Sequence, residues 1–201
     1  ASHAGYYPGA KVMTMKVVFE KESLKLLGTQ IVGSEGVDKR LDVLATAIHC
    51  GMKPEMLKDL DLAYAPPFSS AKDPVNMAGF MIENISKEMI KQYHWDEVKN
   101  IPRDGSVTLL DTRTAYEYKS GHIDGYINIP VDDLRDRLNE LDRSKTVYVI
   151  CQSGLRSYIA CRILSQNGFD CNNFSGGYRF YASVIKEKEM SEYTYPCGME
   201  K

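Results

Sequence analysis

Hydrophobic and polar residues alternate along two stretches near the start of the chain, 11–19 and 25–32, and the polar segment EKES separates them. A period of two is typical of strands with one buried face, so these stretches predict an antiparallel β-hairpin. From Val37 as far as Gly51, apolar residues recur at helical spacing. The sequence therefore predicts a helix directly after the hairpin.

Two more helices are predicted in the first half of the chain. A short one covers residues 55–60, and residues 62–64 form a brief extended segment after it. Asp73 and Pro74 form an N-cap followed by proline at the first helical position, and they begin a helix that runs towards Met89. A hairpin with helices packed against it is a small α+β fold with antiparallel strands.

Short strands and helices alternate in the second half. The predicted strands are 107–110, 126–129, 146–150 and 171–174, and the predicted helices are 114–119, 131–138, 155–168 and 176–185. This alternation is typical of a parallel sheet that helices cover on both faces. The second half therefore predicts an α/β fold.

The change of pattern falls within residues 88–95 and predicts a boundary between two domains. We assign residues 1–87 to the first domain, 88–190 to the second, and 191–201 to a tail with little periodicity. The two halves share no internal repeat.

Composition excludes several functional classes. The chain has 201 residues, a net charge of −2 and scattered lysines and arginines, which argues against a nucleic-acid surface. No apolar run is long enough to span a membrane, and the start of the chain lacks the pattern of a secretory signal. Because the chain also lacks an initiator Met, we expect it to begin inside a longer protein.

The five cysteines are odd in number, form no CxxC pair and show no zinc-ligand spacing. We therefore expect free thiols, no metal site and a reducing compartment, the cytoplasm. Cys50, Cys161 and Cys171 are expected to be small buried hydrophobic residues. Cys197, in the tail, is either a sulfur-accepting thiol or a residue without function, and the second interpretation is favoured.

The segment CQSGLRS, which starts at Cys151, carries the candidate chemistry. It follows a predicted strand and opens a helix, which is where open α/β sheets form their sites. Backbone N–H groups and the positive end of a helix dipole favour an anion there, so a Cys151 thiolate is expected to act as the nucleophile. A buried core cysteine is the alternative interpretation.

Four residues lie between Cys151 and Arg156, namely Gln152, Ser153, Gly154 and Leu155. Gly154 permits the tight curvature, Arg156 either binds an anionic substrate or braces the loop, and Ser157 is expected to cap the helix. Cysteine-dependent phosphatases have one residue more in this interval. The smaller ring of amides suits a sulfur atom better than a phosphate.

Four residues upstream are candidates for supporting roles. Asp111 ends a predicted strand, where its carboxylate can accept N–H bonds from the next turn. Arg113 and Glu117 are spaced so that they could pair on one helix face. His122, in the segment SGHIDG, is either a catalytic base or a structural hydrogen-bonding residue.

Three segments occur in the order that is usual for the rhodanese-like family and resemble its motifs: LLDTRTAYEYKSGHIDGYINIP, TVYVICQSGLRSYIACRILSQNGF and NFSGGYRFY. The resemblance covers roughly residues 93–188. It implies that Cys151 carries sulfur as a persulfide in a ping-pong transfer from a sulfane-sulfur donor to a thiol acceptor. It also implies the structural role for His122.

The segments AGYYPGAKVMTMKVVF and YAPPFSSAKDPVN resemble another family, the dimerisation domain of flavin-dependent pyridine nucleotide–disulfide reductases. The similarity is greatest to CoA-disulfide reductases that are fused to a rhodanese domain. It implies a homodimer in which Tyr6 and Tyr64 reach the partner subunit's active site. A purely interfacial role for the two tyrosines is the alternative.

The same resemblance implies FAD, NAD(P)H and CoA for the whole protein. No GxGxxG fingerprint occurs in the sequence, so this chain is not expected to bind FAD or NAD(P)H by itself. We therefore predict a sulfurtransferase domain that serves such a reductase. Two alternatives stay open: a non-catalytic docking and dimerisation module, and a phosphatase or arsenate reductase on the same fold.

Overall fold

The computed structural model describes the backbone of residues 1–193 and the side chains of residues 1–186. The chain divides into two compact units, Ala1–Met89 and the part from Ile90 onwards, and each unit is described by itself. Cys197 and most of the predicted tail lie outside the described residues.

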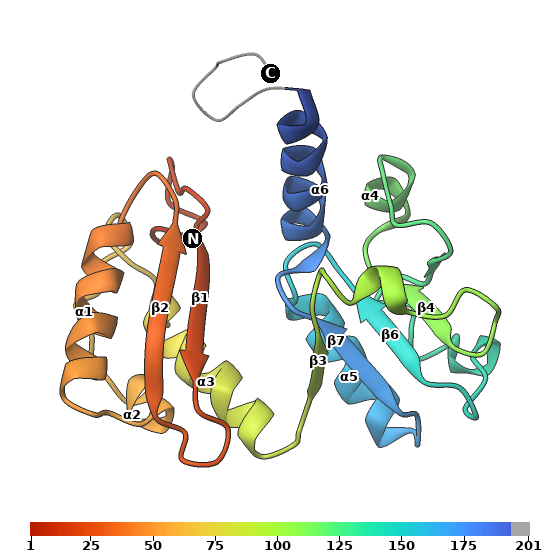
Figure 1. Cartoon of the computed structure of the whole chain (residues 1–201), viewed down its shortest axis with the longest axis horizontal. Coiled ribbons are helices and arrows are strands. Elements are labelled where there is room, and N and C mark those ends of the chain that lie inside the picture. The colour runs from red at the N-terminus through yellow and green to blue at the C-terminus, as the bar shows by residue number, and fades with distance from the viewer. Residues whose placement is uncertain (194–201) are drawn as a thin grey trace. The chain divides into compact units, whose positions relative to one another are not determined.

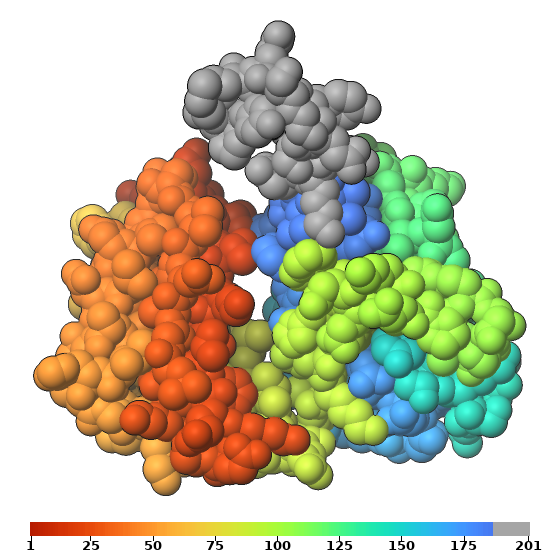
Figure 2. All heavy atoms as spheres, in the orientation of Figure 1, coloured from red at the N-terminus to blue at the C-terminus, as the bar shows by residue number. Residues whose placement is uncertain are grey.

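A two-stranded antiparallel sheet and three helices form the first unit (Figure 1). In chain order the elements are β1 (Thr14–Phe19), β2 (Leu26–Val32), α1 (Val37–His49), α2 (Pro54–Lys58) and α3 (Pro74–Ser86). The predicted hairpin and helices are confirmed, whereas residues 62–64 are assigned to no strand. Apolar side chains from the hairpin and the helices form one core, and the atoms of β2 and α1 leave no opening between them on the face shown (Figure 2).

A buried ion pair holds the irregular segments of this unit together. Arg40 Nη2 lies 2.8 Å from Asp73 Oδ2, and neither side chain is more than 2% exposed. Arg40 also donates to the Ser2 carbonyl at 2.8 Å, and Ser69 Oγ donates to Asp73 at 2.6 Å. Burial would raise the pKa of Asp73, but the hydrogen bonds from Arg40 and Ser69 lower it overall. One pair of buried charges thus links the N-terminal segment, the turn before α3 and the N-cap of α3.

Five parallel strands form the sheet of the second unit, in the order β3-β7-β6-β4-β5. The strands are β3 (Lys91–Tyr93), β4 (Thr108–Asp111), β5 (Ile127–Asn128), β6 (Val147–Ile150) and β7 (Cys171–Phe174). The helices are η1 (Val98–Asn100), α4 (Ala115–Lys119), η2 (Leu138–Glu140), α5 (Leu155–Gln166) and α6 (Gly177–Tyr193), of which η1 and η2 are 3₁₀-helices.

Helices α5 and α6 cover opposite faces of this sheet. Cys171 and Phe174 are an odd number of positions apart on β7, so their side chains point to opposite faces. Cys171 Sγ lies 3.3 Å from the Cys161 carbonyl of α5, and the Phe174 ring centroid lies 6.3 Å from that of Tyr181 on α6. The predicted parallel sheet with both faces covered is therefore confirmed.

One predicted helix is wrong. Residues 131–137 form successive turns that lead into η2, and four of their N–H groups donate to the carbonyl three residues earlier. The Leu134 N–H donates to the Val131 carbonyl at 3.4 Å, and the Arg137 N–H donates to the Leu134 carbonyl at 3.2 Å. Apolar residues three positions apart fit such turns as well as they fit a helix, so the pattern could not distinguish the two.

Strand β3 lies where the sequence predicted only a linker. Its three residues, KQY, are too few to show an alternation, and the strand depends on its pairing with β7, where Lys91 lies opposite Asn172. Helix α6 extends eight residues beyond its predicted end at residue 185. No helix among the described residues is long and apolar enough to cross a membrane.

Candidate active site

Cys151 directly follows β6, the central strand of the five, and begins the turn that leads into α5. The residue is 1% exposed. Its sulfur therefore lies at the carboxyl end of the sheet, at the place where sites form in open α/β folds.

Two groups of the loop donate hydrogen bonds to the Cys151 sulfur. The Gly154 N–H lies 3.1 Å from Sγ, and the Ser157 hydroxyl lies 3.2 Å from it. Gly154 is the N-cap of α5 and has a φ of 105°, a conformation that glycine adopts without strain. The sulfur thus lies at the positive end of the α5 dipole and beside two donors, an arrangement that stabilises a negative charge.

Ser157 does not cap α5 as the sequence predicted. It is the third residue of the helix, already within the first turn, and α5 has no side-chain cap. Its hydroxyl faces Cys151 Sγ and also lies 3.1 Å from the Gly154 carbonyl. Its single proton can therefore be donated to the sulfur when the sulfur carries charge.

The first turn of α6 fixes the peptide groups of the loop. The Tyr178 N–H donates to the Cys151 carbonyl at 2.8 Å, and the Arg179 N–H donates to the Gln152 carbonyl at 3.2 Å. The described chain has no cis peptide bond, and in a trans peptide the N–H points opposite to the C=O. Because these carbonyls face α6, the N–H groups of Gln152 and Ser153 point away from it.

Gly177 permits this close contact. A Cβ atom at Gly177 would lie 2.5 Å from the Ser153 nitrogen and 2.6 Å from the Gln152 carbonyl oxygen, far inside van der Waals contact. Gly177 also has a φ of 70°. A glycine is therefore required where α6 meets the loop.

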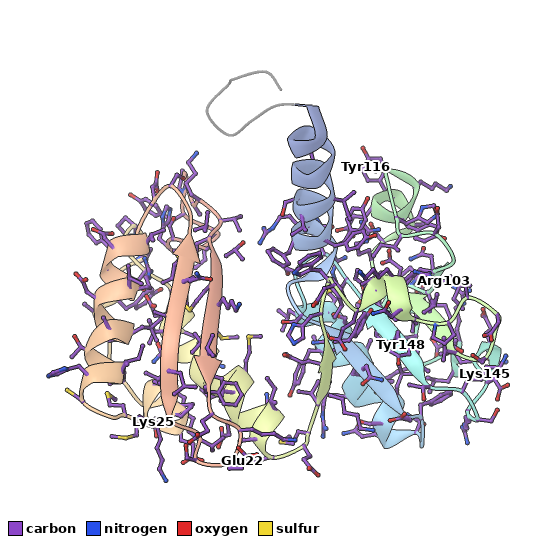
Figure 3. The ribbon with its side chains drawn as sticks, viewed as in Figure 1. Glu22, Lys25, Arg103, Tyr116, Lys145 and Tyr148 are labelled. Carbon is purple, nitrogen blue, oxygen red and sulfur yellow. The ribbon has the colours of Figure 1, made fainter. Side chains whose placement is uncertain are left out.

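Arg156 braces the loop, because Glu117 of α4 binds its guanidinium through two hydrogen bonds of 2.7 Å each. Tyr116, the preceding residue, projects from α4 into solvent and is 82% exposed (Figure 3). The Glu117 carboxylate also accepts the Thr114 N–H in the capping box of α4. The hydrogen bonds from Arg156 are the largest of the effects that lower the pKa of Glu117 to about 2.

The predicted pairing of Arg113 with Glu117 is wrong, because Arg113 binds Asp111 instead. Arg113 Nη2 lies 2.7 Å from Asp111 Oδ2, and both side chains are at most 2% exposed. The Asp111 carboxylate also accepts the Arg113 N–H at 2.9 Å, the contact that its position at a strand end predicts. Arg113 Nη2 also donates to the Gly121 carbonyl, and its guanidinium lies 3.9 Å from the Tyr178 ring centroid. The pair thus connects the end of β4, the turn at Gly121 and the start of α6.

His122 forms contacts of a structural kind. Its ring stacks on Tyr118 with centroids 3.9 Å apart, and its Nδ1 lies 3.1 Å from the Tyr118 carbonyl. None of the described contacts joins His122 to residues 151–157.

The two candidate tyrosines of the first unit lie together. The hydroxyl oxygens of Tyr6 and Tyr64 are 2.8 Å apart, and the residues are 77% and 47% exposed. The hydrogen bond with Tyr6 is the main cause that raises the pKa of Tyr64. The backbone near Tyr6 is fixed by the Ala4 N–H, which donates to the carbonyls of Pro66 and Ser69.

Comparison with known proteins identifies both units. Residues 94–183 match the rhodanese-like domain family, and residues 1–75 match the pyridine nucleotide-disulphide oxidoreductase dimerisation domain family. The chain joins a rhodanese-like domain to a reductase dimerisation domain.

Some relatives match both units of this chain, and others match one unit. The structure of reduced Bacillus anthracis CoADR-RHD is 47% identical, with a TM-score of 0.89 over 92% of this chain and 33% of its own length. An NAD-dependent persulfide reductase from A. fulgidus is 39% identical, with a TM-score of 0.81 over 89% of this chain and 32% of its own. The coenzyme A disulfide reductase of Staphylococcus epidermidis is 44% identical over 79 residues, 39% of this chain and 18% of that protein. This chain thus spans no more than about a third of these relatives.

The remaining cysteines divide into two kinds. Cys161 and Cys171 are buried as predicted, but Cys50 is exposed, contrary to the prediction. Cys50 follows the last residue of α1 on the solvent side, a position that the helical pattern alone does not determine. Among the described residues, no group of three or more His, Cys, Asp or Glu side chains could hold a metal ion.

The sequence indicated the loop of the rhodanese-like domain but not the residues that hold it. Gly177 and Tyr178 fix its peptides, and the Asn173 side chain lies 3.4 Å from the Gly154 carbonyl. The only signal in the sequence is the glycine pair in SGGY, which marks a tight turn but does not reveal what the turn contacts.

We expect Gly177→Ala to slow the reaction of Cys151 with polysulfide by roughly 100-fold, because the added Cβ must displace the Gln152–Ser153 peptide. Gly168→Ala is the matched control. Gly168 has a φ of 83°, but a Cβ there would meet no atom within 4 Å. Gly168→Ala should lose about 1–2 kcal/mol of unfolding free energy through backbone strain, and Gly177→Ala should lose more, because its Cβ also clashes with the loop backbone. Denaturation curves and initial rates of the polysulfide reaction test this, and a wild-type rate in Gly177→Ala would show that the contact does not hold the loop.

We expect the carboxyl group of Glu117 to titrate near pH 2 rather than near its ordinary value of 4.5. A lowered pKa in the folded state means that the pair stabilises the fold fully above the unfolded pKa and loses this effect as the pH falls towards 2. Carbon-13 NMR of the Glu117 carboxyl measures it directly. In Arg156→Gln the midpoint should move up towards 4.5, and a wild-type midpoint already near 4.5 would contradict the described pair.

Proposed function

We propose that the rhodanese-like domain is a sulfurtransferase that carries sulfane sulfur as a persulfide on Cys151. One observation supports this most strongly. The Cys151 sulfur lies at the N-terminus of α5, where the Gly154 N–H and the Ser157 hydroxyl are within 3.2 Å of it. A thiolate and a persulfide are both anions, so the same donors would stabilise the resting nucleophile and its loaded form.

The proposed reaction has two half-steps. In the first, the Cys151 thiolate attacks the outer sulfur of a donor R–S–SH, the donor S–S bond breaks, and its electron pair leaves with R–S⁻. In the second, an acceptor thiolate attacks the outer sulfur of Cys151–S–SH, and the electron pair returns to Cys151. The loop N–H groups of Gln152 and Ser153, which point away from α6, would support the added sulfur.

The arrangement favours sulfur over phosphate chemistry. The loop is one residue shorter than that of cysteine-dependent phosphatases, and Arg156 is already bound by Glu117 through both of its terminal nitrogens. A phosphatase needs that guanidinium for its substrate. A non-catalytic docking module, the other alternative, would not require donors directed at the sulfur.

The wider role that we propose is sulfur delivery to a reductase. The relatives are named coenzyme A disulfide reductase and NAD-dependent persulfide reductase. The first unit would form the homodimer, and its exposed Tyr6–Tyr64 pair would donate hydrogen bonds to a sulfur anion in the partner subunit's active site. CoA is the thiol acceptor that these names suggest.

FAD and NAD(P)H fit no residues of this chain. The parallel sheet of the second unit carries the cysteine loop at its central strand, and no GxGxxG turn follows any strand in the sequence. Both cofactors of the proposed reductase would therefore be held by residues outside this sequence.

Cys151→Ser tests the catalytic role. We expect it to lower sulfur transfer from thiosulfate or polysulfide to a thiol by at least about 100-fold, since Cys151 is the one thiol of the loop and a serine hydroxyl is a far weaker nucleophile towards sulfur. Cys50→Ser, which removes the exposed thiol of the other unit, should leave the rate unchanged. Turnover that survives Cys151→Ser would reject the assignment.

A further inference from the structure

The proposed chemistry brings anions together at Cys151. The thiolate, its persulfide and an incoming thiolate all carry negative charge, and like charges repel more strongly where water is excluded. A cation near the entrance to the loop would reduce this repulsion and raise the local concentration of anionic substrates. Three arginines belong to the loop or contact it: Arg113, Arg156 and Arg179.

The two arginines already described are occupied. Arg156 gives both terminal nitrogens to Glu117, and Arg113 is held by the Asp111 carboxylate and is buried. Neither can turn to a substrate without leaving a carboxylate unpaired, and for the buried Asp111 that loss would be severe. Each of the two pairs is also neutral overall, so neither contributes a net positive charge.

Arg179 differs from both. Its side chain is exposed, and no carboxylate lies within ion-pair distance of it among the described residues. Its position is nevertheless fixed, because its own N–H donates to the Gln152 carbonyl at 3.2 Å. The neighbouring Tyr178 N–H, which donates to the Cys151 carbonyl at 2.8 Å, also holds this turn of α6 against the loop. Arg179 is thus a free guanidinium on a backbone that is anchored to the residue next to the nucleophile.

We infer that Arg179 is a specificity residue that binds the anionic group of the small sulfur donor or acceptor. The inference rests on the proposed function of Cys151. The fork of donors on a guanidinium matches sulfonate, carboxylate and phosphate oxygens, so the substrate class is a thiol or sulfane-sulfur compound with an oxyanion close to the reacting sulfur. Residues 152–155 of the loop are uncharged, so none of them can pair with the charge of such an oxyanion.

The second half-step tests this with two acceptors that share the same two-carbon thiol chain and differ in whether it ends in an anionic group, 2-mercaptoethanesulfonate and 2-mercaptoethanol. The whole chain is first loaded with polysulfide, and mass spectrometry confirms the persulfide. The rate of sulfur loss is then measured for each acceptor and corrected for its thiolate fraction. Wild type should favour the sulfonate by about tenfold at low salt, and added salt should reduce that preference.

Arg179→Gln should slow only the transfer to the sulfonate and bring the two rates to within about twofold of each other. Arg179→Lys, which keeps the positive charge, should keep most of the preference. Lys186→Gln is the matched control. It removes the same charge from an exposed residue two helical turns along α6, about 10 Å away, and should keep the wild-type preference.

The outcomes separate the two proposals. If neither the wild type nor any variant takes up sulfur on Cys151, the proposed function itself is wrong. If loading succeeds but Arg179→Gln keeps the tenfold preference, Arg179 does not bind the anion. An equal loss in Lys186→Gln would also overturn the inference, because the effect would then come from the overall charge of the helix.

Discussion

The contact between the cysteine loop and the first turn of α6 is the constraint on which this site depends. The carbonyls of Cys151 and Gln152 accept N–H bonds from Tyr178 and Arg179, and Gly177 lets the backbones meet at a separation that excludes any side chain. These bonds satisfy N–H groups at the start of α6 that would otherwise lack partners within the helix. They also determine which way the loop peptides face. The orientation of the loop around the sulfur is therefore set by an element that begins 26 residues after Cys151.

Two arginines at the cysteine loop are each paired with a carboxylate of the protein. Arg113 with Asp111 and Arg156 with Glu117 connect β4, α4, α5 and the start of α6 without leaving net charge at the sulfur. Stabilisation of a sulfur anion is left to the neutral donors at the start of α5 and to the dipole of that helix. The first unit also contains a buried ion pair, Arg40 with Asp73. Its hydrogen bonds with Ser2 and Ser69 hold the segments that precede Tyr6 and follow Tyr64.

Local pattern was enough to predict most of the fold and the position of the nucleophile. The hairpin, the long helices and the alternation of the second half each depend on periodicity within about ten residues, and CQSGLRS is continuous in the sequence. Features that depend on distant partners were missed. Strand β3 exists because β7 pairs with it. Glu117 binds Arg156, which is 39 residues away in the sequence, and not Arg113, which is four residues away. Gly154 is the N-cap of α5, so Ser157 lies within the first turn of the helix, where its hydroxyl faces the sulfur. The exposure of Cys50 likewise depends on how α1 packs, which spacing alone does not determine.

The role of Cys151 as the sulfur carrier is tested most directly by the site at which the chain takes up sulfur. The whole chain is incubated with polysulfide, its free thiols are alkylated, and its peptides are mapped by mass spectrometry. We expect a gain of one sulfur atom on Cys151, although this residue is 1% exposed, and none on the exposed Cys50. Sulfur on Cys50 with none on Cys151 would show that exposure rather than the loop controls the reaction, and would rule out Cys151 as the sulfur carrier.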